Sequence, residues 1–111
     1  MSMEDQNRLQ HHVDSIARRI SECDFSDICD DGEQEISAFD YLQDALDIEY
    51  VVNGKGEYLG ARVLVAFGGP NIWVNTRTGI VEGYWYADKA SASFHDGIGL
   101  DDALEELWNC R

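Results

Sequence analysis

Basic residues are scarce in this sequence and absent from one long stretch of it. The 111 residues include 8 Lys and Arg against 22 Asp and Glu, which gives a net charge of −14 at pH 7. Between Ile20 and Asn53 there are eleven carboxylates and no Lys or Arg. A chain with this charge repels DNA, RNA and anionic membrane surfaces, and it attracts cations and basic proteins. The sequence therefore disfavours direct nucleic-acid binding and predicts a basic protein as partner.

Cysteines and long apolar runs are also few. Cys23, Cys29 and Cys110 are odd in number and include no C-x-x-C pair, so they indicate neither a disulfide framework nor a zinc site. The longest apolar run, from Val63 to Phe67, is far shorter than the roughly 20 residues of a membrane span. Because the N-terminus has no apolar stretch of the secretory kind, we expect a cytoplasmic protein that does not interact with membranes.

The composition is otherwise that of a folded domain. Hydrophobic residues make up 44% of the chain and charged residues 27%, which are ordinary values for globular proteins. A chain of this length buries roughly 60–70% of the surface of its unfolded state, so it can fold without disulfides or metals. We therefore expect residues 1–111 to form a single acidic domain.

Apolar residues at helical spacing predict three amphipathic helices. The first runs from about Met3 to Glu22, the second from about Ser37 to Leu46, and the third begins near Leu100. Between the second and the third the apolar period changes to two, which is typical of strands. Turn residues separate four such segments, at 48–53, 59–67, 71–75 and 80–86. Residues 89–94 alternate weakly and fit either a fifth strand or a loop.

These elements predict an α+β fold. Two N-terminal helices would precede a four-stranded antiparallel β-meander, and a C-terminal amphipathic helix would pack with them mainly on one face of the sheet. We expect the core to include six apolar residues, namely Leu42, Leu46, Val63, Val65, Leu104 and Trp108.

The sharpest candidate for a binding surface is a carboxylate stripe on the second predicted helix. Asp40, Asp44 and Asp47 recur at helical spacing, although like charges at i,i+4 destabilise a helix by roughly 0.2–0.5 kcal/mol per pair. A surface for a basic partner, or one that imitates a phosphate backbone, would retain them, whereas a merely solvated face is the alternative. At about 5 Å per charge the helix is sparser than duplex DNA, so we expect carboxylates of the preceding loop to complete the surface. They are Asp30, Asp31, Glu33 and Glu35.

Patterns for metal binding and catalysis are weak. Placing Gly32 at the sixth position of a calcium loop puts Ala38 at the twelfth, where a bidentate Glu is required. We therefore expect no metal or other cofactor. His95 and Asp96 can be drawn into a site with Cys110 or Ser93, but no nucleophile has a family-specific local signature. We expect no catalytic residue, and a binding protein rather than an enzyme.

Tyrosines of the last predicted strand offer a second candidate binding surface. Tyr84 and Tyr86 alternate with Trp85, so helices that cover the Trp85 face would leave both tyrosines with Glu82 on an open face. Exposed tyrosines are enriched at protein interfaces. The alternative is that this face is covered as well, either by a helix or by a second subunit. In the second case the protein would be a homo-oligomer.

In size and charge the chain is similar to the small acidic proteins that mobile elements use as anti-restriction or anti-CRISPR inhibitors. The resemblance rests on the net charge of −14 over 111 residues, and it transfers no site residue. It implies a DNA mimic that inhibits a basic nucleic-acid-handling protein. An immunity protein or secretion chaperone that masks a basic toxin or effector is the alternative, and a small enzyme of unknown reaction is a third.

Overall fold

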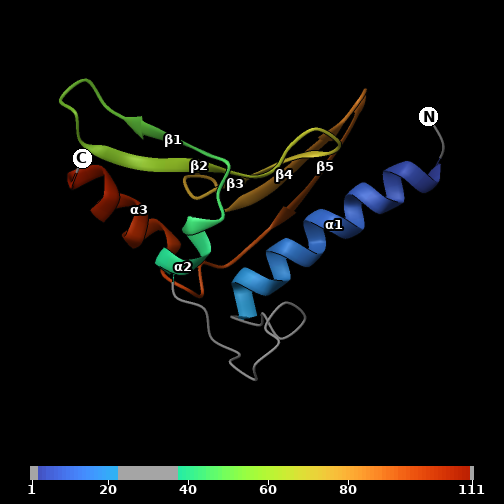
Figure 1. The fold of residues 1–111 in the computed structure, drawn as a ribbon, viewed down its shortest axis with the longest axis horizontal. Helices are drawn as coiled ribbons and strands as arrows, with labels where there is room; N and C mark the ends of the chain where they lie inside the picture. The colour runs from blue at the N-terminus through green and yellow to red at the C-terminus, as the bar shows by residue number, and fades with distance from the viewer. Residues whose placement is uncertain (1–2, 23–37, 111) are drawn as a thin grey trace.

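The computed structural model describes residues 3–22 and 38–110 of the chain. The strands form one antiparallel sheet in the order β1-β2-β3-β4-β5, and the helices lie on one side of it (Figure 1). The elements are α1 (Met3–Glu22), α2 (Ala38–Gln43), β1 (Asp47–Val52), β2 (Tyr58–Ala66), β3 (Asn71–Asn75), β4 (Ile80–Trp85), β5 (Asp88–Ser93) and α3 (Leu100–Asn109). The fold is α+β, as the sequence predicts.

The core lies between the helices and the sheet face that they cover. Alternation along the strands places Val63, Val74 and Val81 on this face, where the register pairs Val63 with Val74 and Val74 with Val81. All three valines are fully buried. Burying a side chain of this size contributes about 1.5–3 kcal/mol, so this row across β2, β3 and β4 supplies much of the cohesion of the two layers. The helices contribute Val13, Ile16, Ala17, Ile20, Leu42, Leu100, Ala103 and Leu104 to the same cluster.

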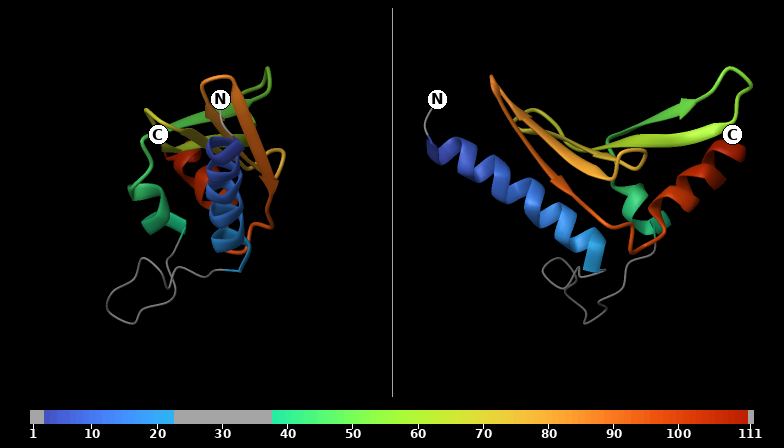
Figure 2. Two further views of the ribbon diagram at one scale, coloured as in Figure 1. Left: turned by 90° about the vertical axis from the view of Figure 1, so that its right-hand side faces the viewer. Right: turned by 180° about the vertical axis from the view of Figure 1, so that it is seen from behind.

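Helix α1 packs closely on β4 and β5 (Figure 2). A Cβ atom on Gly83 would lie only 2.7 Å from Val13 Cγ1 and 2.9 Å from Leu9 Cδ1. Leu9 and Val13 are both buried. The missing side chain of Gly83 therefore gives α1 the space to approach the backbone of β4.

The second helix is shorter than the sequence pattern predicts. The apolar spacing indicates a helix to about Leu46, whereas α2 ends at Gln43. The backbone N of Leu46 donates to Leu64 O at 2.8 Å, so the chain has already joined the sheet at this point. Leu46 is 60% exposed, and the prediction of Leu46 as a core residue is wrong because pairing with β2 overrides the helical spacing.

The other expected core residues are buried to different degrees. Leu42, Val63 and Leu104 are confirmed as buried, whereas Val65 and Trp108 are half-buried. The register of β2 with β3 shifts between Leu64 and Ala66. The alternation predicted through residues 59–67 therefore breaks before the strand ends, and a clean inward position for Val65 is lost.

The sheet has one strand more than the predicted four. Residues 88–93, which the sequence left open between strand and loop, form β5 and pair with β4 from Trp85–Asp88 to Ile80–Ser93. The inward side chains of β5 include Ala90 and Ala92, which pack against the core. Small residues here weaken the hydrophobic alternation in the sequence but leave room for α1.

Replacing Gly83 with Ala is expected to destabilise the fold by about 1–3 kcal/mol, because the new Cβ overpacks the contact with Leu9 and Val13. The measurement is the urea unfolding midpoint. Gly54→Ala is the control, since nothing lies within 4 Å of its added Cβ. Where space allows, Ala is more favourable than Gly in a strand by roughly 0.5–1 kcal/mol. A more stable Gly83→Ala protein would therefore contradict the packing of α1 on β4.

Candidate functional site

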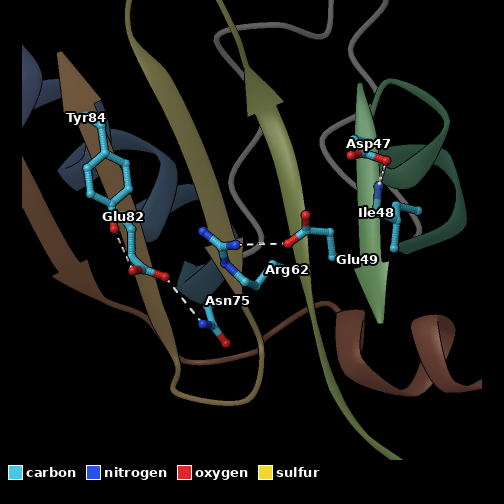
Figure 3. Close-up of polar contacts among 7 residues, drawn as sticks. All are labelled: Asp47, Ile48, Glu49, Arg62, Asn75, Glu82 and Tyr84. Carbon is cyan, nitrogen blue, oxygen red and sulfur yellow. Dashed lines mark hydrogen bonds and ion pairs between the residues drawn. The ribbon is translucent and has the colours of Figure 1, made fainter. Parts of the chain in front are cut away.

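No helix within residues 3–22 and 38–110 covers the second face of the sheet, which we call the outer face (Figure 2). The strand register places Glu49 of β1 opposite Arg62 of β2, and Trp73 of β3 opposite Glu82 of β4. Figure 3 views this face with the helices behind the strands. Polar and aromatic side chains, rather than a second apolar layer, therefore form this surface.

Arg62 connects two neighbours on the outer face. Its Nη1 donates to Glu49 Oε1 at 2.9 Å (Figure 3), and its guanidinium carbon lies 4.3 Å from the ring centre of Trp73. An exposed ion pair contributes less than about 1 kcal/mol, and an exposed cation–π contact contributes roughly 0.5–1 kcal/mol. The arrangement fixes the orientation of Arg62 more than it stabilises the fold.

A second polar network centres on Glu82. Tyr84 Oη donates to Glu82 Oε2 at 3.0 Å, and Asn75 Nδ2 donates to Glu82 Oε1 at 3.3 Å (Figure 3). Burial and the hydrogen bond to Glu82 raise the pKa of Tyr84, so its hydroxyl remains a donor at neutral pH. The expectation that Tyr84 shares an open face with Glu82 is confirmed.

Tyr86 lies in a different setting from the one predicted. Strand β4 ends at Trp85, and Tyr86 occupies the turn to β5 with a φ of 55° and 88% exposure. The left-handed region costs a residue with a Cβ roughly 1–2 kcal/mol. Tyr84 and Tyr86 nevertheless border one hollow of about 370 Å³ together with Phe67, which is 73% exposed. Their role in binding stays a prediction.

The carboxylate stripe predicted on the second helix does not form. Asp40 lies in α2, Asp44 follows the last residue of that helix, and Asp47 is the first residue of β1. The three residues therefore share no helical face, and Asp47 Oδ1 instead accepts a hydrogen bond from Ile48 N at 2.9 Å. Two other predicted features lie outside the described residues. They are the loop carboxylates Asp30, Asp31, Glu33 and Glu35 and the calcium-like segment at residues 27–37.

Helix α3 carries a carboxylate surface that the sequence reading missed. Its ten residues include four acids and neither Lys nor Arg. Asp101 and Glu105, and likewise Asp102 and Glu106, are spaced i,i+4 and so place like charges side by side. Asp102, Glu105 and Glu106 are exposed. The i,i+4 spacing can be read from the sequence. Acids in the first turn of a helix are, however, also expected from the helix dipole. This explanation accounts for Asp101 and Asp102 alone and draws attention away from Glu105 and Glu106, which lie one turn later.

Contacts with the β1–β2 hairpin hold α3 in place. Tyr58 Oη donates to Asp101 Oδ1 at 2.6 Å, and Trp108 Nε1 donates to Gly56 O at 3.3 Å. The rings of Tyr50 and Trp108 lie 5.3 Å apart. Both ends of the helix are thereby attached to the hairpin, so the carboxylates of α3 project from a fixed support.

The residues suggested for catalysis do not assemble. Asp96 accepts hydrogen bonds from the backbone N of Leu100 at 2.7 Å and of Asp101 at 2.9 Å, so its carboxylate caps α3. Cys110 follows the opposite end of α3, and a ten-residue helix is about 15 Å long. Asp96 is therefore engaged in capping instead of orienting His95, and Cys110 lies far from both.

The described charges are distributed unevenly. Residues 44–62 and 100–109, which we call the acidic end, contain eight carboxylates against Lys55 and Arg62, a net charge of −6. Helix α1 contains four carboxylates against three Arg, a net charge of −1. In Figure 1 the acidic end lies on the left and α1 on the right. Negative charge is therefore concentrated on the side of α3 and β1.

Comparison with protein-family models, curated proteins and solved structures finds no match to this chain. In the part of the chain that the structure describes, no three or more His, Cys, Asp or Glu side chains gather as ligands for a metal ion. No helix in residues 3–22 or 38–110 has both the length and the apolar character to traverse a bilayer. The function must therefore be argued from the surfaces themselves.

Tyr58→Phe is expected to lower stability by about 1–2 kcal/mol at neutral pH, because it removes the hydrogen bond to the charged Asp101. Burial and this hydrogen bond raise the pKa of Tyr58 above 10.0. The stability that comes from the neutral phenol is present below pH 10 and is lost as pH rises through the raised pKa. The variant should therefore lose stability less steeply above about pH 10 than the parent.

Urea unfolding followed from pH 7 to about pH 11 measures both effects. Burial also raises the pKa of Tyr41 to about 12, so part of the alkaline decline remains in the variant. Tyr86→Phe is the control, because Tyr86 is 88% exposed in the turn between β4 and β5. An alkaline slope equal to that of the parent would rule out the Tyr58–Asp101 bond as the anchor of α3.

Proposed function

We propose that this chain is a small acidic binding protein of the cytoplasm, whose acidic end docks on the basic surface of a protein that handles nucleic acids. The observation that supports it is the exposed side of α3, where Asp102, Glu105 and Glu106 stand without a Lys or Arg in the helix. Charge complementarity of this kind steers a basic partner into the correct orientation and accelerates association.

The composition of α3 works against its own stability. Each like-charged i,i+4 pair costs roughly 0.2–0.5 kcal/mol. Glu105 and Glu106 lie in the second half of the helix, where the dipole favours cations over anions. A helix shaped for stability alone would carry Lys or Arg at these exposed positions. A destabilising pattern at an exposed surface is typical of a functional site.

The charge density of α3 favours a basic protein over full imitation of DNA. Four carboxylates on a helix about 15 Å long amount to one charge per ~4 Å, against one per ~1.7 Å of duplex DNA. Asp44, Asp47 and Glu49 on and beside β1 add charge to the same end of the molecule. We expect this surface to guide encounter with the partner more than it supplies binding energy.

Glu105→Gln combined with Glu106→Gln tests the proposal. The variant should gain about 0.5–1 kcal/mol in stability, because two like-charged pairs and an unfavourable dipole interaction are removed. It should also associate more slowly with the basic partner at low ionic strength. The partner is the basic protein that the parent captures from an extract of the native cell and releases in a salt step. Association rates are then measured by surface-immobilised kinetics at low and high salt.

A matched control changes the same charge elsewhere. Asp14→Asn with Glu22→Gln removes two carboxylates from exposed positions of α1, so it should leave the association rate close to that of the parent. Equal slowing by both double variants would indicate a response to net charge alone. Unchanged association of the α3 variant at low salt, or failure of any basic protein to elute with salt, would reject the proposal.

A further inference from the structure

A hollow of about 490 Å³ lies on the outer face, away from the acidic end. Strands β4 and β5 form its floor, the β3–β4 turn one wall, and the side chain of Gln10 from α1 part of its rim. Sites for small ligands typically have volumes of about 300–1,000 Å³ and combine apolar surface with a few placed polar groups. The hollow has both properties, since Ile80 and the ring of Tyr84 line it beside Glu82 and Lys89.

Hydrogen bonds hold the polar groups of the hollow in place before any ligand arrives. Tyr84 Oη and Asn75 Nδ2 each bind one oxygen of Glu82. The side-chain oxygen of Asn75 accepts the backbone N of Arg77 at 3.0 Å. Gln10 Nε2 donates to Ser91 O at 3.0 Å, which fixes the amide at the edge of β5. Preorganised groups of this kind reduce the entropy that a ligand must lose on binding.

The charges that line the hollow sum to zero and so disfavour a ligand that carries charge of one sign only. Glu82 and Lys89 contribute one negative and one positive charge, so a bare cation meets an ammonium group and a bare anion meets a carboxylate. An ionised carboxylate accepts about four hydrogen bonds, and Tyr84 and Asn75 occupy two of those of Glu82. The remaining capacity suits hydroxyl donors, and the three donors of Lys89 suit hydroxyl or ether oxygens.

We propose that this hollow binds a neutral polyhydroxylated ligand, a mono- or disaccharide. One face of the sugar ring would pack on Tyr84, which is 38% exposed, and on Ile80. Its hydroxyl groups would donate to Glu82 and accept from Lys89. Aromatic side chains combine a broad apolar surface with little conformational entropy to lose, which suits them to the flat face of a sugar. This site is independent of the acidic end and of any protein partner.

The test is an NMR titration of the ¹⁵N-labelled full chain with glucose, N-acetylglucosamine and their β-1,4-linked dimers. We expect saturable shifts at the amides of Asn75, Glu82 and Lys89, with a dissociation constant on the order of millimolar. Sodium phosphate and arginine hydrochloride serve as anionic and cationic probes, and neither should produce the same saturable shifts.

Variants on the same face distinguish specific binding in the hollow from weak contact of the sugar with the surface. Glu82→Gln should weaken binding roughly tenfold, because a hydrogen bond to a charged group is lost. Tyr84→Ala should weaken it by a similar factor through loss of the aromatic surface. Glu49→Gln is the matched control, since it removes a carboxylate from the outer face at a residue that binds Arg62 and does not line the hollow. Its affinity should equal that of the parent.

Dispersed NMR spectra of each variant confirm that the chain is folded. If a variant does not fold, Lys89→Met takes its place, because Lys89 is exposed. Three results would overturn the proposal. In the first, none of the four sugars produces saturable shifts up to about 50 mM. In the second, the Glu82 or Lys89 variant binds the sugar with the same affinity as the parent. In the third, phosphate or arginine produces saturable shifts at the hollow and no sugar does.

Discussion

The placement of the described helices on one face of the sheet determines the character of both faces. Helix α1 reaches β4 closely because Gly83 has no side chain, and the valine row from Val63 to Val81 then closes the core. The opposite face has no such apolar layer within the described chain, so side chains there interact with one another and with water. Ion pairs, cation–π contacts and tyrosine hydrogen bonds at this surface contribute little to stability. Such a face can be altered for binding at small cost to the fold.

Charge is arranged on the same framework. The acidic end has a net charge of −6, whereas α1 has a net charge of −1. The hollow on the outer face adds one carboxylate and one ammonium group, and so no net charge. A Debye length of about 8 Å at physiological salt confines the field of exposed carboxylates to their surroundings. The acidic end and the hollow therefore present different chemistry to different ligands, although one small domain supports both.

The sequence predicts correctly the elements whose apolar residues recur with a clear period. It does not predict the elements whose structure depends on pairing between strands that are distant in the sequence. Helix α1 follows the predicted range from Met3 to Glu22, since one apolar stripe specifies it without help from other elements. Helix α2 is short and has few hydrogen bonds of its own, so it ends early, and the backbone of Leu46 instead bonds to Leu64 of β2. Strand β5 has a weak pattern because alanines face α1, and only its register with β4 reveals it.

The same distinction explains what could be foreseen of the candidate sites. Asp40, Asp44 and Asp47 form a stripe only if the helix continues, so the early end of α2 removes that surface. The sequence predicts the position of Tyr84 on the open face because strand alternation is a local property. The partners of Glu82 depend on turn geometry and register, which bring Asn75 and Tyr84 to the two oxygens of one carboxylate.

Tyr84 contributes to more than one feature of the outer face. It borders two hollows, one with Lys89 and Glu82 and the other with Phe67 and Tyr86. Its hydroxyl is engaged by Glu82, so the ring cannot rotate away without loss of that bond. Tyr84 therefore lines both a polar hollow and an aromatic one. A ligand that extends from the first hollow toward Phe67 and Tyr86 would have to pass this ring, and its length rather than its charge would then determine how much of the outer face it contacts.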